Sequence, residues 1–185
     1  MMRNFFMLEI DLSTGRTEKK DVSDLFSKYI GGTGTATALL SEMEPELNPF
    51  NQKAPVIFAS GPFSSVFPVA TKTVAMFKSP LTGNLGESHA GGRLAMAMFG
   101  AGFHVIKITG ACSFPCCLEI EGDEVKVHRA SSLKGMSALA AERVLRDHYK
   151  SDYKRSIIRI GPAGERKSPI ACVTVDSSRH FGRLG

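Results

Sequence analysis

Hydrophobic and polar residues alternate over residues 6–12, with Leu8 and Ile10 on one side and Glu9 and Asp11 on the other. A period of two is typical of a strand with one face in the core and one in water. Ser-Thr-Gly turns the chain after this run, so residues 6–12 and 17–22 are predicted to form a hairpin. Similar runs predict further strands at residues 56–59, 73–77, 104–109, 117–121, 124–128, 156–160 and 170–175.

Helical spacing is clearest at residues 137–149, where Leu139, Val144 and Leu145 form an apolar stripe between charged residues. Shorter helices are predicted at 23–29, 35–43 and 93–99, and the glycines of residues 31–34 are expected to separate the first two. We therefore expect an α+β fold, rich in strands, with mixed or antiparallel sheets and three or four helices. At 185 residues the chain suits a single domain, residues 1–185.

Composition narrows the classes of function. The net charge of +5 is a mild excess, the basic residues are scattered and tryptophan is absent, all of which argue against a nucleic-acid partner. The charge suits an acidic cofactor or an acidic protein partner. No run approaches the roughly 18 apolar residues of a membrane span, and the start of the chain lacks the apolar block of a signal peptide. We expect a cytoplasmic protein without a membrane partner.

The four cysteines are expected to be idle thiols in a reducing compartment. Cys112, Cys116 and Cys117 do not have the paired spacing of a structural zinc site, and neighbouring strand residues point to opposite faces. The sequence also lacks the motifs of a phosphate-binding lysine loop, a helical zinc site or a serine-hydrolase nucleophile.

Residues 72–103 carry the strongest candidate for a binding site. They are predicted to run as a strand, a turn at 79–84, an exposed glycine loop at 86–92 and a helix. Glycines ahead of a helix let backbone N–H groups approach an anion, although glycines equally occur in turns that bind no ligand. A nucleotide-phosphate site at residues 31–34 or 86–92 is a weaker alternative. The irregular loop 63–70 holds Phe63, Val66 and Phe67 and is expected to pack against another part of a larger enzyme.

The stretch KSPLTGNLGESHAGG at residues 78–92 resembles the KSPLTG…SNSGG signature of the aldehyde:ferredoxin oxidoreductase family, which comprises tungsten or molybdenum enzymes with a pterin cofactor. Other stretches resemble that family in the same order along the chain, at residues 8–15, 29–34, 58–62, 160–165 and 179–185. The resemblance implies a β-rich N-terminal domain that acts as a platform for the two pterins.

The resemblance also implies a set of site residues. Lys72 aligns with a pterin-phosphate-contacting arginine, Gly91 with a glycine beside the cofactor, and Arg183 with a second cofactor-contacting arginine. Ala90 and Gly92 flank that glycine. His89 and Leu184 align with residues whose backbone carbonyls hold a Mg ion between the phosphates. Lysine in place of arginine keeps the charge but loses the bidentate geometry.

The implied function is that of the pterin-cofactor domain of an enzyme that oxidises aldehydes to carboxylates. Electrons would pass through a [4Fe–4S] cluster, whose ligands lie in later domains, to ferredoxin or an iron–sulfur subunit. The chain would then be inactive alone, as a truncated form or a split-gene subunit, with the downstream domains and a second copy as further partners. A non-catalytic scaffold that keeps only the fold is the alternative from another class. The substrate and the choice between tungsten and molybdenum stay open.

Overall fold

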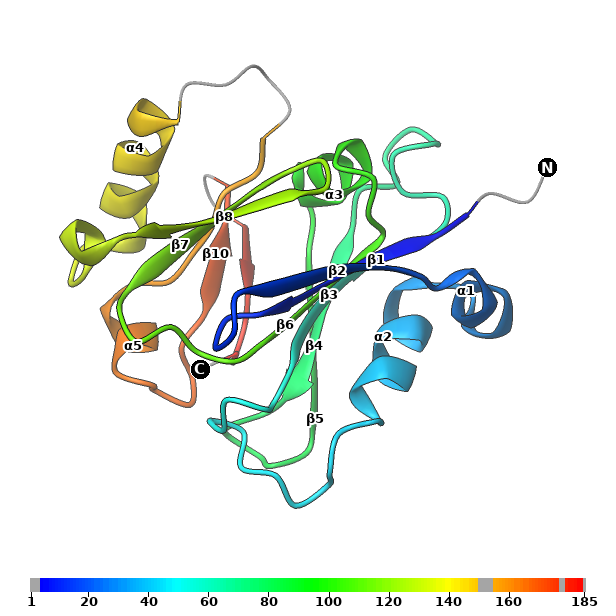
Figure 1. Ribbon diagram of the computed structural model, residues 1–185, viewed down its shortest axis with the longest axis horizontal. Helices are drawn as coiled ribbons and strands as arrows, with labels where there is room; N and C mark the ends of the chain where they lie inside the picture. Colours follow the sequence, from blue (N-terminus) through cyan, green and yellow to red (C-terminus); the bar gives the residue numbers. More distant parts are fainter. Residues whose placement is uncertain (1–3, 150–154, 177–178, 185) are drawn as a thin grey trace.

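A six-stranded mixed sheet forms the centre of the protein in the computed structural model, which describes residues 4–149, 155–176 and 179–184 (Figure 1). The strands, in their order across the sheet, are β2 (Arg16–Asp21), β1 (Phe6–Asp11), β6 (Val105–Thr109), β3 (Val56–Ser60), β4 (Thr73–Lys78) and β5 (Leu85–Ala90). β1 and β6 pair in parallel and all other neighbours are antiparallel. The expected mixed sheet and the hairpin of β1 and β2 are confirmed.

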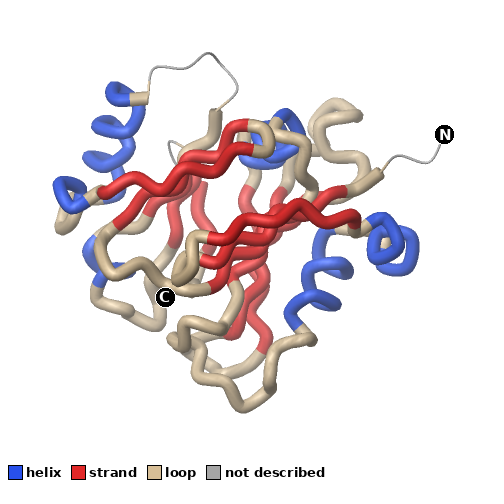
Figure 2. Tube along the Cα trace, in the orientation of Figure 1, coloured by secondary structure: helices blue, strands red, loops and turns tan. Residues whose placement is uncertain are grey.

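Both faces of this sheet are covered, as Figure 2 shows. Two helices, α1 (Ser23–Tyr29) and α2 (Gly32–Leu40), pack on one face against Met7, Ile57 and Val74. Leu8, Ile10 and Phe58 point to the opposite face, into a second apolar cluster. We expected only one face of β1 to be core, but Met7 is buried as well because the helices cover its side.

The second face is covered by the later part of the chain. A three-stranded sheet contributes β9 (Ile158–Arg159), β10 (Val173–Val175) and β11 (Arg179–Phe181), and α3 (Leu94–Gly100) closes the end of the cluster. The outer layer contains the hairpin β7 (Cys116–Glu121) and β8 (Glu124–Arg129), the 3₁₀ turn η1 (Ser131–Leu133), α4 (Ala138–His148) and α5 (Pro162–Glu165).

The helix predicted at 137–149 is confirmed as α4. Ser137 caps it, because the Ser137 hydroxyl accepts a hydrogen bond from the Ala140 N–H at 3.2 Å. A buried ion pair between Glu142 and Arg159, 2.5 Å apart, links α4 to β9. Both charges lie in the interior, so removing Glu142 would leave the buried Arg159 without its ion-pair partner, whereas Glu142 also pairs with Arg146.

Three local expectations were wrong. The described residues form five α-helices instead of three or four, because residues 162–165 complete a single turn that begins at Pro162. Within the glycine run at 31–34, only Gly31 separates α1 from α2, as the N-cap of α2, and residues 32–34 already form the first turn of that helix, which we expected to start at residue 35. Residues 86–90 belong to strand β5 and not to an exposed loop. Gly86 is needed there for packing, since a Cβ would come within 2.5 Å of the Phe77 ring.

Candidate functional site

Two sheet edges meet where β5 lies alongside β11. β5 is the last strand of the six-stranded sheet and β11 the last strand of the three-stranded sheet. The Gly182 N–H donates a hydrogen bond to the Ser88 hydroxyl, 2.8 Å away, and so holds the two edges together. We call this junction of β5, β11 and the start of β4 the seam. Edge strands carry backbone groups that are free to bind a ligand.

The seam brings the predicted site residues together from distant parts of the sequence. Lys72 directly precedes β4, whose first residue, Thr73, lies opposite Ala90 of β5. This register places Lys72 beside Gly91 and Gly92. Arg183 and Leu184 follow Gly182, which is bonded to Ser88 of β5, so they reach the seam from the end of β11. Ser88 and Gly91 are three positions apart, which is about 10 Å in an extended chain.

The two glycines after β5 have different roles. Gly92 has a φ of 112°, and a Cβ there would lie 3.1 Å from the Asp176 Oδ2 atom, so the fold itself requires glycine. At Gly91 a Cβ would meet nothing within 4 Å, and its backbone does not have a positive φ. No contact inside the described chain explains a glycine at position 91. The open space there suits the close approach of a ligand to the backbone.

Asp176 organises the seam and was not identified from the sequence. It is buried, and its carboxylate accepts hydrogen bonds from the Arg93 N–H at 3.1 Å and from the Ser156 hydroxyl at 3.0 Å. The Ile157 N–H lies 3.4 Å from the same carboxylate. Asp176 thus joins the ends of β5, β9 and β10, and it occupies the backbone group at the start of α3 that we expected an anionic ligand to use.

The His89 side chain lies on the other face of β5 from Ser88. Its Nε2 atom is 2.6 Å from the Glu87 Oε1 atom, which also accepts a hydrogen bond from the Thr33 hydroxyl of α2 at 2.9 Å. These hydrogen bonds, from His89 first and then Thr33, hold the pKa of Glu87 below its ordinary value. The imidazole is therefore used in a contact with Glu87, which in turn bonds to α2, and the backbone of His89 is the part of this residue that remains for a role at the seam.

Positive charge collects along the seam. Lys72, Arg179 and Arg183 are exposed and make no ion pair with any residue that the structure describes. Arg93 approaches the Asp176 carboxylate at 3.6 Å. Cations without counter-charges, next to open space at Gly91, fit a phosphate-bearing group. Sequence reasoning missed Arg93 and Arg179 as site residues, although Arg93 directly follows the glycine pair and Arg179 begins the last stretch that resembles the family.

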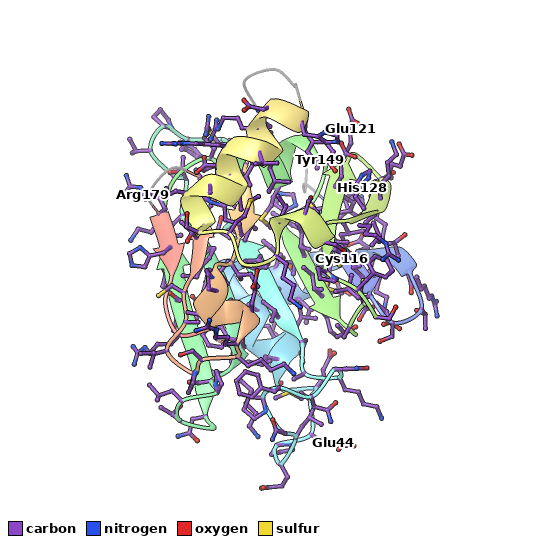
Figure 3. All side chains as sticks on the ribbon, turned by 90° about the vertical axis from the view of Figure 1, so that its left-hand side faces the viewer. Glu44, Cys116, Glu121, His128, Tyr149 and Arg179 are labelled. Atoms are coloured by element: carbon purple, nitrogen blue, oxygen red, sulfur yellow. The ribbon has the colours of Figure 1, made fainter. Side chains whose placement is uncertain are left out.

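Cys116, on the outer hairpin, lies away from the seam and has a thiol that is hard to deprotonate. Figure 3 shows Cys116 on the β7–β8 hairpin, on the opposite side of the view from Arg179. Burial and the neighbouring Cys112 raise the pKa of Cys116 to about 12, so its thiol stays protonated at neutral pH. All four cysteines are free, as expected. Among the described residues, no group of three or more His, Cys, Asp or Glu side chains could hold a metal ion.

Comparison with known proteins identifies the family. The family described as "Aldehyde ferredoxin oxidoreductase, N-terminal domain" matches residues 7–185. The chain belongs to this family. Proteins named "Tungsten-containing aldehyde ferredoxin oxidoreductase" from Pyrococcus horikoshii and Pyrococcus abyssi are each 31% identical to it over 97% of its length. The match covers 30% of each of those proteins, so the domain spans less than a third of its curated relatives.

A solved structure confirms the fold. The domain matches a chain of the "Active site complex BamBC of Benzoyl Coenzyme A reductase in complex with 1,5 Dienoyl-CoA" with a TM-score of 0.90 and 27% identity. That match covers 98% of the domain and 29% of the solved chain. The expected α+β architecture and the family resemblance are therefore both confirmed. In the described part of the domain no helix is long and apolar enough to cross a membrane.

Proposed function

We propose that this domain binds the tungsten–pterin cofactor of a larger oxidoreductase at the seam. The observation that carries the proposal is the convergence of three segments at one pair of sheet edges: the start of β4 at Lys72, residues 89–92 after β5, and residues 183–184 after β11. The relatives' names supply the tungsten. The surplus of unpaired cations at the seam suits the phosphates of a pterin cofactor.

Each seam residue has a distinct role in this proposal. Lys72 and Arg183 neutralise phosphate charge at the two ends of the seam, and Gly91 lets the cofactor approach the backbone. The backbone carbonyl groups of His89 and Leu184 would hold a Mg ion at the phosphates, since carbonyl oxygen is a ligand that Mg²⁺ accepts. Ala90 and Gly92 shape the chain around Gly91. Tungsten is favoured over molybdenum by the names of the relatives.

The complete enzyme would oxidise an aldehyde to a carboxylate in the cytoplasm. The cofactor supplies the oxygen-atom and electron transfer, and this domain supplies position and electrostatics. We propose that a [4Fe–4S] cluster held by parts of the enzyme beyond this chain passes electrons to ferredoxin, and that the isolated chain is inactive. A homodimer is a further expectation from the family resemblance.

The decisive test is metal and pterin analysis of the complete enzyme, purified anaerobically. We expect tungsten and pterin in the wild type, and a loss of most of both in the double variant Lys72→Ala, Arg183→Ala. A control double variant, Lys134→Ala and Arg166→Ala, removes two exposed cations elsewhere and should retain the cofactor. If the wild type contains neither metal nor pterin, the proposal fails and the non-catalytic scaffold becomes the better explanation.

A second substrate class follows from the solved neighbour. The solved chain belongs to a complex of benzoyl-coenzyme A reductase, and benzoyl-coenzyme A is an aromatic acyl thioester. Assays of the complete enzyme with aliphatic and aromatic aldehydes, and with an aromatic acyl-coenzyme A plus a low-potential reductant, separate the two classes. Turnover of aldehydes alone supports our proposal, whereas turnover of the thioester alone would replace the substrate and leave the cofactor assignment intact.

A further inference from the structure

Two arginines and a buried aspartate meet beside Gly92, at the Lys72 end of the seam. The Arg93 guanidinium lies 3.6 Å from the Asp176 Oδ1 atom. Arg179 reaches the same place, because a Cβ on Gly92 would lie 3.6 Å from the Arg179 Cγ atom and 3.1 Å from the Asp176 Oδ2 atom. We call Arg93, Arg179 and Asp176 the arginine cluster. None of these three side chains has a role in the proposed function.

Asp176 is a fixed anion at the centre of the arginine cluster. Its side chain is 9% exposed, and its carboxylate accepts hydrogen bonds from the Arg93 N–H and the Ser156 hydroxyl. Its backbone φ of 49° lies in the left-handed region, which a residue with a Cβ adopts at a cost. A buried carboxylate requires a counter-charge, and the Arg93 guanidinium forms an ion pair with it. Asp176 therefore determines where the Arg93 side chain lies.

The Arg93 guanidinium is held near Asp176 without being saturated by it. Their separation of 3.6 Å is longer than the roughly 2.7–2.9 Å of a charge-assisted hydrogen bond. A guanidinium has several N–H donors, and the Arg93 side chain makes no hydrogen bond with any residue that the structure describes. The side chain is also 39% exposed. Donors that are placed but unused can bind an anion without first being ordered.

The arginine cluster carries a net positive charge. One carboxylate faces two guanidinium-bearing side chains, and Arg179 forms no ion pair with a described residue. Arg159 also acts on the Asp176 carboxylate, but Arg159 is itself paired with Glu142. Lys72 adds a further cation at this end of the seam. Like charges gathered in this way favour the binding of an additional anion.

The geometry of the guanidinium group specifies which anion fits. A guanidinium presents parallel N–H donors that match two oxygens of a phosphoryl group, whereas an ammonium is a point charge without this fork. Lys72 can thus attract a phosphate but cannot orient it. Arg93 and Arg179 approach from two different strands' ends, β5 and β11, and so supply donors from two directions. The open space at the neighbouring Gly91 leaves room for the ligand.

We propose that Arg93 and Arg179, held in place around Asp176, bind one phosphoryl group at the Lys72 end of the seam. In the proposed function this phosphoryl group belongs to the pterin cofactor. The inference rests on the proposed function for the identity of the ligand, whereas the phosphate contact itself follows from the arginine cluster. In Figure 3 Arg179 lies at the edge of the molecule, where an incoming group can reach it.

Isothermal titration of the 185-residue chain with pyrophosphate tests the contact without a pterin. We expect Arg93→Gln and Arg179→Gln each to weaken binding at least about tenfold, because each removes charge-assisted hydrogen bonds. Arg93→Lys keeps the charge but loses the fork, so it should recover only part of the affinity. The matched control, Arg143→Gln, removes an exposed arginine of α4 without an ion pair to any described residue. It should change the affinity less than about twofold.

Cofactor retention in the complete enzyme identifies the ligand. During anaerobic dialysis, Arg93→Gln should lose tungsten and pterin at least about fivefold faster than the wild type, and Arg143→Gln should lose them at the wild-type rate. Urea titration checks that each variant is folded, as expected for changes to side chains that are partly or fully exposed.

Three results would overturn the proposal: no binding of pyrophosphate by the wild-type chain, equal binding by Arg93→Gln and Arg143→Gln, or a wild-type rate of cofactor loss in Arg93→Gln. A different result separates the inference from the proposed function. If the wild-type enzyme holds neither tungsten nor pterin, while pyrophosphate binding still depends on Arg93, the proposed function fails and the phosphate contact stands.

Discussion

Replacing Gly92 by alanine tests how the fold builds the seam. Gly92 has a φ of 112°, and an added Cβ would lie 3.1 Å from the Asp176 Oδ2 atom. The same carboxylate oxygen accepts the Arg93 N–H at 3.1 Å. The methyl group and the carboxylate therefore compete for the same space, and the backbone cannot relax to avoid this without leaving its left-handed conformation.

Two costs and one gain set the size of the effect. A Cβ in the left-handed region costs about 1–2 kcal/mol. Displacing the Asp176 carboxylate weakens a charge-assisted hydrogen bond that contributes about 1.5–3 kcal/mol. Alanine also restricts the unfolded chain, which returns about 0.4–1 kcal/mol. We expect Gly92→Ala to lower the free energy of unfolding by about 2–4 kcal/mol.

Gly91→Ala is the matched control, because a Cβ at Gly91 meets open space and its φ lies outside the positive region. This variant should keep the free energy of unfolding within about 0.5 kcal/mol of the wild type. Urea titration followed by circular dichroism measures both variants. If Gly92→Ala unfolds at the same urea concentration as Gly91→Ala, the steric argument about Asp176 is wrong. Gly91→Ala should instead reduce the cofactor content of the complete enzyme.

Arg183→Gly should raise the free energy of unfolding by about 0.5–1 kcal/mol, because Arg183 has a φ of 60° that glycine adopts without strain. Urea titration measures this change, and a variant that is less stable than the wild type would contradict the prediction. Lys72→Arg should slow the loss of tungsten from the complete enzyme during dialysis, because a guanidinium makes two parallel hydrogen bonds to phosphate, and faster loss would argue against a phosphate contact. Burial alone would raise the pKa of Glu9, but hydrogen bonds and the charges of Lys20 and Lys107 outweigh it and lower the pKa. The Glu9 carboxylate therefore stabilises the fold above its unfolded pKa, and this stability is lost as the pH falls through the folded pKa. Between about pH 7 and pH 3, the free energy of unfolding measured by urea titration should decline less in Glu9→Gln than in the wild type. Equal declines would refute the assignment.

Some of the candidate site could be inferred from sequence, because the family motifs contain it. The resemblance directed attention to Lys72, residues 89–92 and Arg183, and the seam brings these segments together. Their roles in binding stay predictions. Asp176 could not be inferred, because an isolated aspartate near the end of a strand has no local signature, and its importance comes from reaching Arg93, 83 residues earlier in the chain.

The sequence by itself determined the elements whose signals are local. Alternation over residues 6–12, the Gly-Asp turn after β7 and the apolar stripe of α4 each depend on neighbours within a few residues, so they survive without tertiary context. Tertiary structure decided which strands pair and which glycines belong to strands. The parallel pairing of β1 with β6 joins residues almost a hundred positions apart, and β5 becomes a strand because β4 offers it an edge and Phe77 packs against Gly86. Pairing across such distances depends on burial of both sheet faces, a property that no short window of sequence contains.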